Sequence, residues 1–115
     1  MCIRDSEKGM GAGLGFNANY PLAAGTVYDQ WSAALRAAIS GIQTFTADAL
    51  VVSLGVDTFE NDPISAFKLT TEDYPIYGAE LAKLSLPTVF IMEGGYGVPE
   101  IGDNVAGVLS GFLNS

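Results

Sequence analysis

Histidine is absent from the 115-residue sequence, and cysteine occurs once, as Cys2. A zinc site built on imidazoles, a Ser/His/Asp triad and a Cys/His pair all need histidine, so this chain cannot form them from its own residues. A lone cysteine cannot form an internal disulfide, which agrees with a reducing compartment. Catalysis that depends on imidazole must therefore draw its histidines from outside this sequence.

Basic residues are also scarce, because 5 Lys and Arg stand against 13 Asp and Glu, for a net charge of -8. Phosphate recognition depends on clustered Lys and Arg, so we expect no nucleic-acid partner; a cationic substrate suits the charge better. Solubility alone is the simplest interpretation of the charge. No apolar run approaches the roughly 18 residues of a membrane span, and the N-terminus lacks a secretory signal. We therefore expect one cytoplasmic domain without membrane contact.

Apolar periodicity predicts strands and helices that alternate along the chain. Thr26 and Asp29 form an expected capping box, and a helix should follow to about Thr44. Its predicted buried stripe is Trp31, Ala34, Leu35, Ala38, Ile39 and Ile42. Nearly continuous apolar runs at residues 49–54 and 88–92 predict strands covered on both faces. A helix beginning near Thr71 lies between these strands, which implies that they pair in parallel.

Three further segments carry weaker signals. Alternating apolar residues at positions 16–22 predict a half-buried strand. The glycine run at residues 9–15 is similar to a dinucleotide-binding loop, but such a loop needs a strand before it and a helix directly after it. A Rossmann-type nucleotide binder therefore rests on that run alone. A last helix should begin at Pro99, with a buried stripe of Ile101, Val105, Leu109 and Phe112.

Polar side chains follow both predicted strands at their carboxyl ends, where parallel sheets bind ligands. Asp57 lies three residues beyond Leu54, and Tyr96 lies four beyond Met92, so both should reach the same sheet edge. Asp57 also has an interpretation as a turn or cap residue. A structural role is the favoured interpretation of Asp62, Glu93 and Asn104. For Glu93 the alternative is a buried base.

Three segments in this order resemble the histone deacetylase superfamily. They read Gly-Phe-Asn-Ala-Asn-Tyr-Pro-Leu with Gly25-Thr26, then Val-Ser-Leu-Gly-Val-Asp-Thr-Phe-Glu-Asn-Asp-Pro-Ile-Ser, then Phe-Ile-Met-Glu-Gly-Gly-Tyr. The Asp-Thr-Phe and Glu-Gly-Gly-Tyr forms are most similar to the bacterial acetylpolyamine amidohydrolases. The resemblance implies an α/β, three-layer arginase-deacetylase fold with a parallel central sheet, of which only the C-terminal part is present.

The resemblance also implies a zinc-dependent deacetylase that releases acetate from acetylated polyamines or acetyl-lysine-like amines. Asp57 matches the family's last zinc ligand, and Tyr96 matches the tyrosine whose hydroxyl donates a hydrogen bond to the oxyanion. Gly94 and Gly95 would line the acyl channel. For the full-length protein the resemblance extends to a K+ site and a homodimer. The family's other zinc ligands and its paired histidines belong upstream of residue 9, so we expect the chain alone to be inactive.

By the same comparison, residues 9–115 form the C-terminal part of one catalytic domain. Residues 1–8 are expected to be a non-native leader, because Met-Cys-Ile-Arg-Asp-Ser resembles translated adapter DNA. An alternative function stays open, namely a non-catalytic α/β fragment or binding module without metal.

Overall fold

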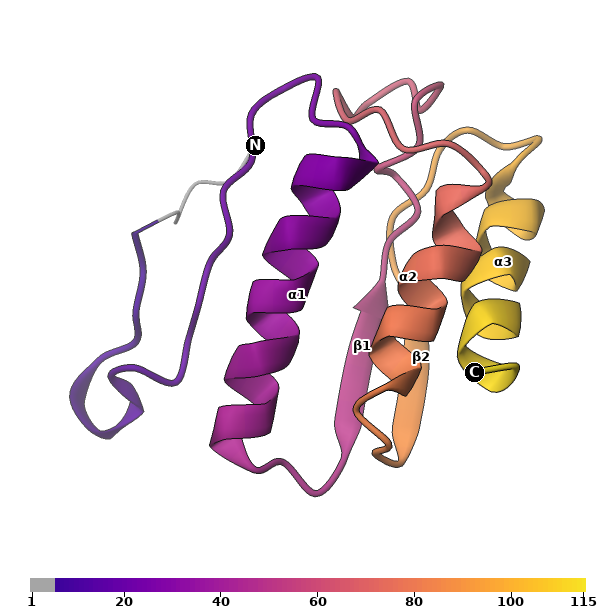
Figure 1. The fold of residues 1–115 in the computed structure, drawn as a ribbon. Helices are drawn as coiled ribbons and strands as arrows, with labels where there is room; N and C mark the ends of the chain where they lie inside the picture. Colours follow the sequence, from indigo (N-terminus) through magenta and orange to yellow (C-terminus); the bar gives the residue numbers. More distant parts are fainter. Residues whose placement is uncertain (1–5) are drawn as a thin grey trace.

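The computed structural model describes residues 6–115, which contain three α-helices, one short 3-10 helix and a two-stranded sheet (Figure 1). In chain order the elements are η1 (Gly11–Gly13), α1 (Tyr28–Phe45), β1 (Leu50–Leu54), α2 (Asp73–Ala82), β2 (Thr88–Met92) and α3 (Ile101–Leu113). Most of the segment expected to be a non-native leader, residues 1–5, lies outside the described residues. No helix in the described range is long and apolar enough to cross a membrane.

The sheet consists of β1 and β2, which pair in parallel from Leu50 opposite Thr88 to Leu54 opposite Met92. Both predicted strands and their parallel pairing are thus confirmed. One face of the sheet packs against side chains from all three helices. The other face is open in the described residues, because Val51 is 64% exposed and Val89 is 51% exposed. The prediction that both strands are covered on both faces is therefore wrong for this chain.

The core lies between the inner sheet face and the helices. Its buried hydrophobic residues are Ile39, Leu54, Val56, Phe59, Tyr74, Tyr77, Leu81 and Val108. Trp31 packs against this cluster, with its ring centroid 4.8 Å from that of Tyr77, so its predicted core role is confirmed. The predicted capping box is wrong, because the Thr26 hydroxyl instead donates to the carbonyl of Ala23 at 2.7 Å and α1 begins at Tyr28.

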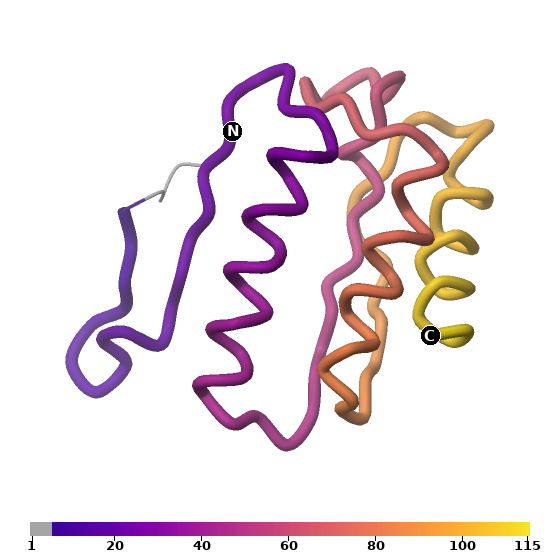
Figure 2. Tube along the Cα trace, in the orientation of Figure 1, coloured from indigo at the N-terminus to yellow at the C-terminus, as the bar shows by residue number. Residues whose placement is uncertain are grey.

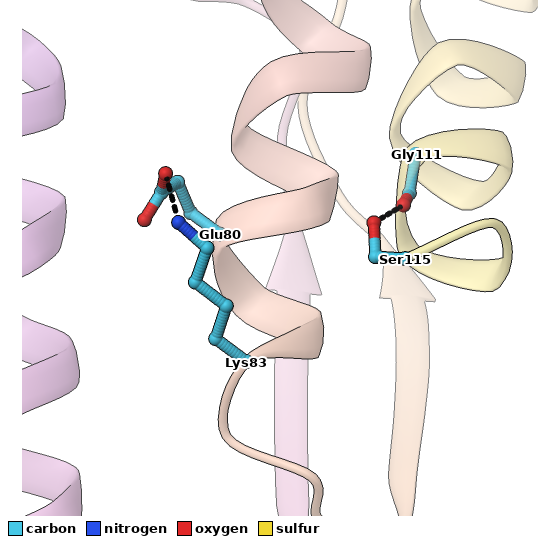
Figure 3. Close-up of polar contacts among 4 residues, drawn as sticks. All are labelled: Glu80, Lys83, Gly111 and Ser115. Carbon is cyan, nitrogen blue, oxygen red and sulfur yellow. Dashed lines mark hydrogen bonds and ion pairs between the residues drawn. The ribbon is translucent and has the colours of Figure 1, made fainter.

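Helix α2 also begins later than predicted, at Asp73. The carboxylate of Asp73 accepts hydrogen bonds from the backbone N–H of Thr70 at 2.7 Å and from its hydroxyl at 3.1 Å. On the side of α2 away from α3, Lys83 donates to Glu80 at 2.6 Å (Figure 3). The same view shows Ser115 donating to the Gly111 carbonyl, which closes the last turn of α3.

Helices α2 and α3 lie side by side, as the tube in Figure 2 shows. The buried residues of α3 are Asn104 and Val108, whereas Leu109 is 36% exposed. The predicted stripe is therefore wrong at Leu109, because α3 turns its glycine face toward α2. Pro99 precedes α3 in a turn and does not open it.

The N-terminal segment runs alongside α1 without forming a strand (Figures 1 and 2). Phe16 is 71% exposed, so the half-buried strand predicted at residues 16–22 is wrong. The segment is held instead by side chains: Asn17 donates to the Glu7 carbonyl at 3.0 Å, and Phe16 meets Phe45 edge-on at 5.9 Å. An extended stretch, not a helix, follows the glycine run at residues 9–15, so the context of a dinucleotide-binding loop is not met.

Candidate functional site

The loops that follow β1 and β2 meet at the carboxyl edge of the sheet. The backbone N–H of Glu93 donates to the Leu54 carbonyl at 2.9 Å, and the N–H of Val56 donates to the Gly94 carbonyl at 2.8 Å. These bonds continue the strand pairing into the loops. The two loops therefore leave the sheet together, as the parallel arrangement predicted.

Asp57 lies in the first loop with its carboxylate against the second. A methyl group at Gly94 would approach Asp57 Oδ2 to 2.4 Å, and one at Gly55 would approach Oδ1 to 2.9 Å. Both distances are too short for a side-chain carbon atom, so a side chain at either position would displace the carboxylate from its present place. Asp57 is half-buried, which leaves part of it open to a ligand.

Tyr74 of α2 supports the backbone on both sides of Asp57. Its hydroxyl donates to the Val56 carbonyl at 3.1 Å and lies 3.2 Å from the Thr58 hydroxyl. Burial raises the pKa of Tyr74 to about 12, and the negative charge of Asp57 adds to this effect. Tyr74 was not among the candidate residues identified from the sequence, and its polar role is visible only in the structure. A tyrosine among the apolar residues of a helix stripe is the signal for a buried hydroxyl that needs a partner.

Asp62 connects the first loop to the second. Its Oδ1 accepts hydrogen bonds from the N–H groups of Ile64 at 2.9 Å and Ser65 at 3.0 Å, and its Oδ2 accepts one from the N–H of Tyr96 at 2.8 Å. Burial acts to raise the pKa of Asp62, but these donors and the Gly97 N–H hold it below the ordinary value. The predicted bracing role of Asp62 is confirmed.

Tyr96 stands on the second loop with its side chain 48% exposed. Before it, Gly95 has a φ of 150° and packs so closely on Val56 that an added methyl would approach Val56 Cγ2 to 2.7 Å. The backbone of Tyr96 is thus tethered while its phenol extends toward solvent. The structure brings the Tyr96 loop to Asp57 through Gly94, two positions earlier in the sequence.

The remaining two candidate residues have different surroundings. Glu93 is exposed, so its alternative interpretation as a buried base is wrong. Asn104 is only 1% exposed, in agreement with a structural role, and its Oδ1 has no hydrogen-bond partner among the described residues.

Metal binding needs more ligands than this site supplies. Within residues 6–115, no group of three or more His, Cys, Asp or Glu side chains is placed to hold a metal ion. Zinc sites in proteins normally have at least three protein ligands, so Asp57 can be one of them at most. The described residues alone therefore do not fit a zinc ion, and the other ligands would have to come from further polypeptide.

Comparison with known proteins assigns the chain and its fold to a family. The histone deacetylase domain model matches residues 4–112, and the chain belongs to this family. The chain is similar to a crystal structure of acetylpolyamine aminohydrolase from Burkholderia pseudomallei, with a TM-score of 0.90 and 36% identity over 94% of this chain and 32% of that one. The expected α/β deacetylase-type fold is thereby confirmed.

Two curated bacterial relatives are more similar in sequence. Acetylpolyamine amidohydrolase 2 of Pseudomonas aeruginosa is 59% identical over 106 residues, and acetylpolyamine amidohydrolase of Mycoplana ramosa is 57% identical over 105 residues. These matches cover 92% and 91% of this chain. The chain spans only 31% of the length of each relative.

Proposed function

We propose that this chain is part of a zinc-dependent deacetylase that releases acetate from acetylated polyamines or acetyl-lysine-like amines. The proposal rests on sequence identity, which is higher to acetylpolyamine amidohydrolases than to a histone deacetylase of the same family. Three acetylpolyamine amidohydrolases are 56% to 59% identical to the chain, whereas histone deacetylase 8 of Xenopus laevis is 30% identical. The net charge of -8 also suits a polyamine, which is cationic.

In this proposal Asp57 is one zinc ligand, and the other ligands come from residues outside this chain. Its half-buried carboxylate, held beside Gly94 at the sheet edge, has the charge and the exposure that this role requires. A zinc ion bound there would polarise the acetyl carbonyl and lower the pKa of the attacking water. The chain alone, with a single such ligand, is then inactive.

Tyr96 would donate its phenolic hydrogen bond to the oxyanion that forms as water adds to the acetyl carbonyl. Its exposed side chain on a tethered backbone supports this role. Gly94 and Gly95 would line the acyl channel through their backbone. A side chain at Gly94 would collide with Asp57, and one at Gly95 would collide with Val56. For the whole protein we propose a cytoplasmic location, a K+ site and a homodimer, with no nucleic-acid or membrane partner.

The test replaces the matching third of the Pseudomonas aeruginosa acetylpolyamine amidohydrolase 2 with residues 9–115 of this chain. The chimera should bind zinc and release acetate from an acetylated polyamine. Asp57→Asn should remove both properties. Tyr96→Phe should retain zinc and lower kcat by about 10²- to 10³-fold, as expected for one oxyanion donor.

Tyr20→Phe serves as the control, because Tyr20 is exposed and lies on the N-terminal segment, away from both loops. It should leave zinc content and kcat unchanged. A folded chimera without zinc would instead favour the non-catalytic binding module. Full activity in Tyr96→Phe would remove the tyrosine from the mechanism.

A further inference from the structure

The Asp62 carboxylate divides its hydrogen bonds between two loops that are far apart in sequence. Oδ1 accepts from Ile64 and Ser65, three or fewer positions away, and so fixes the carboxylate on its own loop. Oδ2 reaches across to Tyr96, 34 positions later. Hydrogen bonds to an ionised carboxylate are about twice as strong as neutral ones, so this is a firm link between the loops.

The Tyr96 loop needs such a link because its own sequence does not hold it in place. Gly94, Gly95 and Gly97 surround Tyr96, and glycine loses more backbone freedom on ordering than any other residue. The Val56 N–H holds the beginning of the loop through the Gly94 carbonyl. After Tyr96, the backbone bonds of Val98 and Glu100 return to Tyr96 and Gly97 themselves and reach no other element.

Packing covers the phenol only in part. The Tyr96 side chain is 48% exposed, whereas the core residue Tyr74 is fully buried. The Tyr96 backbone therefore fixes the point from which the phenol extends, and so the positions that its hydroxyl can reach. An oxyanion donor must lie within about 2.7–3.1 Å of its acceptor, and a misplacement of about 1 Å can cost 10²-fold in rate.

We propose that Asp62 is a positioning residue that holds the Tyr96 backbone so that the phenol faces the substrate beside Asp57. The proposal rests on the proposed function of Tyr96 as oxyanion donor. Asp62 acts through Tyr96 and touches neither the substrate nor the metal. It is part of the loop geometry that makes the tyrosine effective.

The decisive variant is Asp62→Asn in the chimera described above. Asparagine has the same shape but only one acceptor oxygen, so its amide N–H must oppose backbone N–H donors on one of the two loops. We expect kcat to fall by about 10- to 100-fold while zinc content and KM stay close to those of the parent. In a Tyr96→Phe background, Asp62→Asn should lower kcat no further, because the group that it positions is gone.

Gly111→Ala is the matched control for a loss of stability alone, because Gly111 packs on Pro75 between α2 and α3 and not on either loop. Its effect on kcat, if any, should be the same with and without Tyr96→Phe. An Asp62→Asn variant that lowers kcat equally in both backgrounds would overturn the proposal.

Amide hydrogen exchange separates this proposal from the proposed function. Asp62→Asn should speed exchange at the Tyr96 and Gly97 amides at least 10-fold relative to the β2 amides, whether or not the chimera has activity. Unchanged exchange at Tyr96 overturns the positioning role. An inactive chimera with faster exchange at Tyr96 supports the link between the loops and rejects only the deacetylase function.

Discussion

Two buried polar side chains, Tyr74 and Asp62, each hold the backbone beside one candidate site residue. Tyr74 bonds to the backbone just before Asp57, and Asp62 bonds to the backbone of Tyr96. The sequence indicated a structural role for Asp62 but no polar role for Tyr74. The difference is physical, because an aspartate before proline is a familiar loop brace, whereas a tyrosine in an apolar stripe is equally explained by packing.

Tyr74→Phe should destabilise the protein at neutral pH by about 1 kcal/mol, since it leaves the Val56 carbonyl without this buried donor. The pKa of Tyr74 is raised from 10.0 to about 12, so the neutral phenol favours the folded state. This stabilisation is complete below pH 10 and is lost as the pH rises through 12. The stability difference between parent and variant should therefore shrink across that range in urea unfolding.

Burial raises the pKa of Tyr77 as well, and Tyr77 is present in both proteins. The difference between parent and variant therefore isolates Tyr74. Tyr20→Phe, at an exposed site, should unfold like the parent at every pH. A Tyr74→Phe difference that stays constant from pH 9 to 12 would contradict the assignment.

At the scale of elements, the crossing of α2 over α3 depends on glycines that have no side chain to separate the helices. A methyl group at Gly78 would meet the Val108 carbonyl, and one at Gly111 would meet the carbonyl of Pro75. Gly107 of α3 also packs closely on α2, whereas Gly102 faces open space.

This difference gives a matched pair of helix substitutions. Gly102→Ala should stabilise the protein by up to about 1 kcal/mol, because alanine has the higher helix propensity and meets no neighbour. Gly111→Ala makes the same chemical change but should destabilise by about 1–3 kcal/mol through overpacking against the Pro75 backbone. Thermal unfolding measures both. Equal shifts in the two variants would show that propensity, not helix contact, governs these positions.

At the scale of the whole molecule, the open sheet face is the main departure from expectation. Val51 lies opposite Val89 in the register, and Ser53 lies opposite Ile91, all on the side away from the helices. The sheet has two strands in the described residues, so each strand also has an edge with unpaired backbone groups. Apolar surface and unpaired edges together favour association between chains.

We therefore expect the isolated chain to self-associate at micromolar concentration. Val51→Lys and Val89→Lys place charges on the open face and should lower the average mass in sedimentation or light scattering. Ile64→Lys is the control, because Ile64 is 71% exposed and lies in the connection between β1 and α2, outside both strands. Association that falls equally in the control would point to net charge rather than to the sheet face.

Much of this architecture could be predicted from local pattern. The helix stripe around Trp31 and the strand at residues 88–92 follow from apolar periodicity, which depends on residues a few positions apart. The convergence of Asp57 with the second loop also followed, since parallel strands end at one edge. The wrong predictions concern segments whose structure depends on residues far away in the sequence. Residues 16–22 alternate like a strand but have no strand beside them among the described residues.

The sequence by itself determined the order and type of the main elements, the absence of histidine and the candidate pair Asp57 and Tyr96. Only the tertiary structure decided which sheet face is covered, which side of α3 is buried and how Asp62 joins the two loops. The reason is how far apart in the sequence the interacting residues lie. Propensity, periodicity and capping depend on neighbours along the chain, whereas burial and cross-loop hydrogen bonds depend on residues that meet only once the chain has folded.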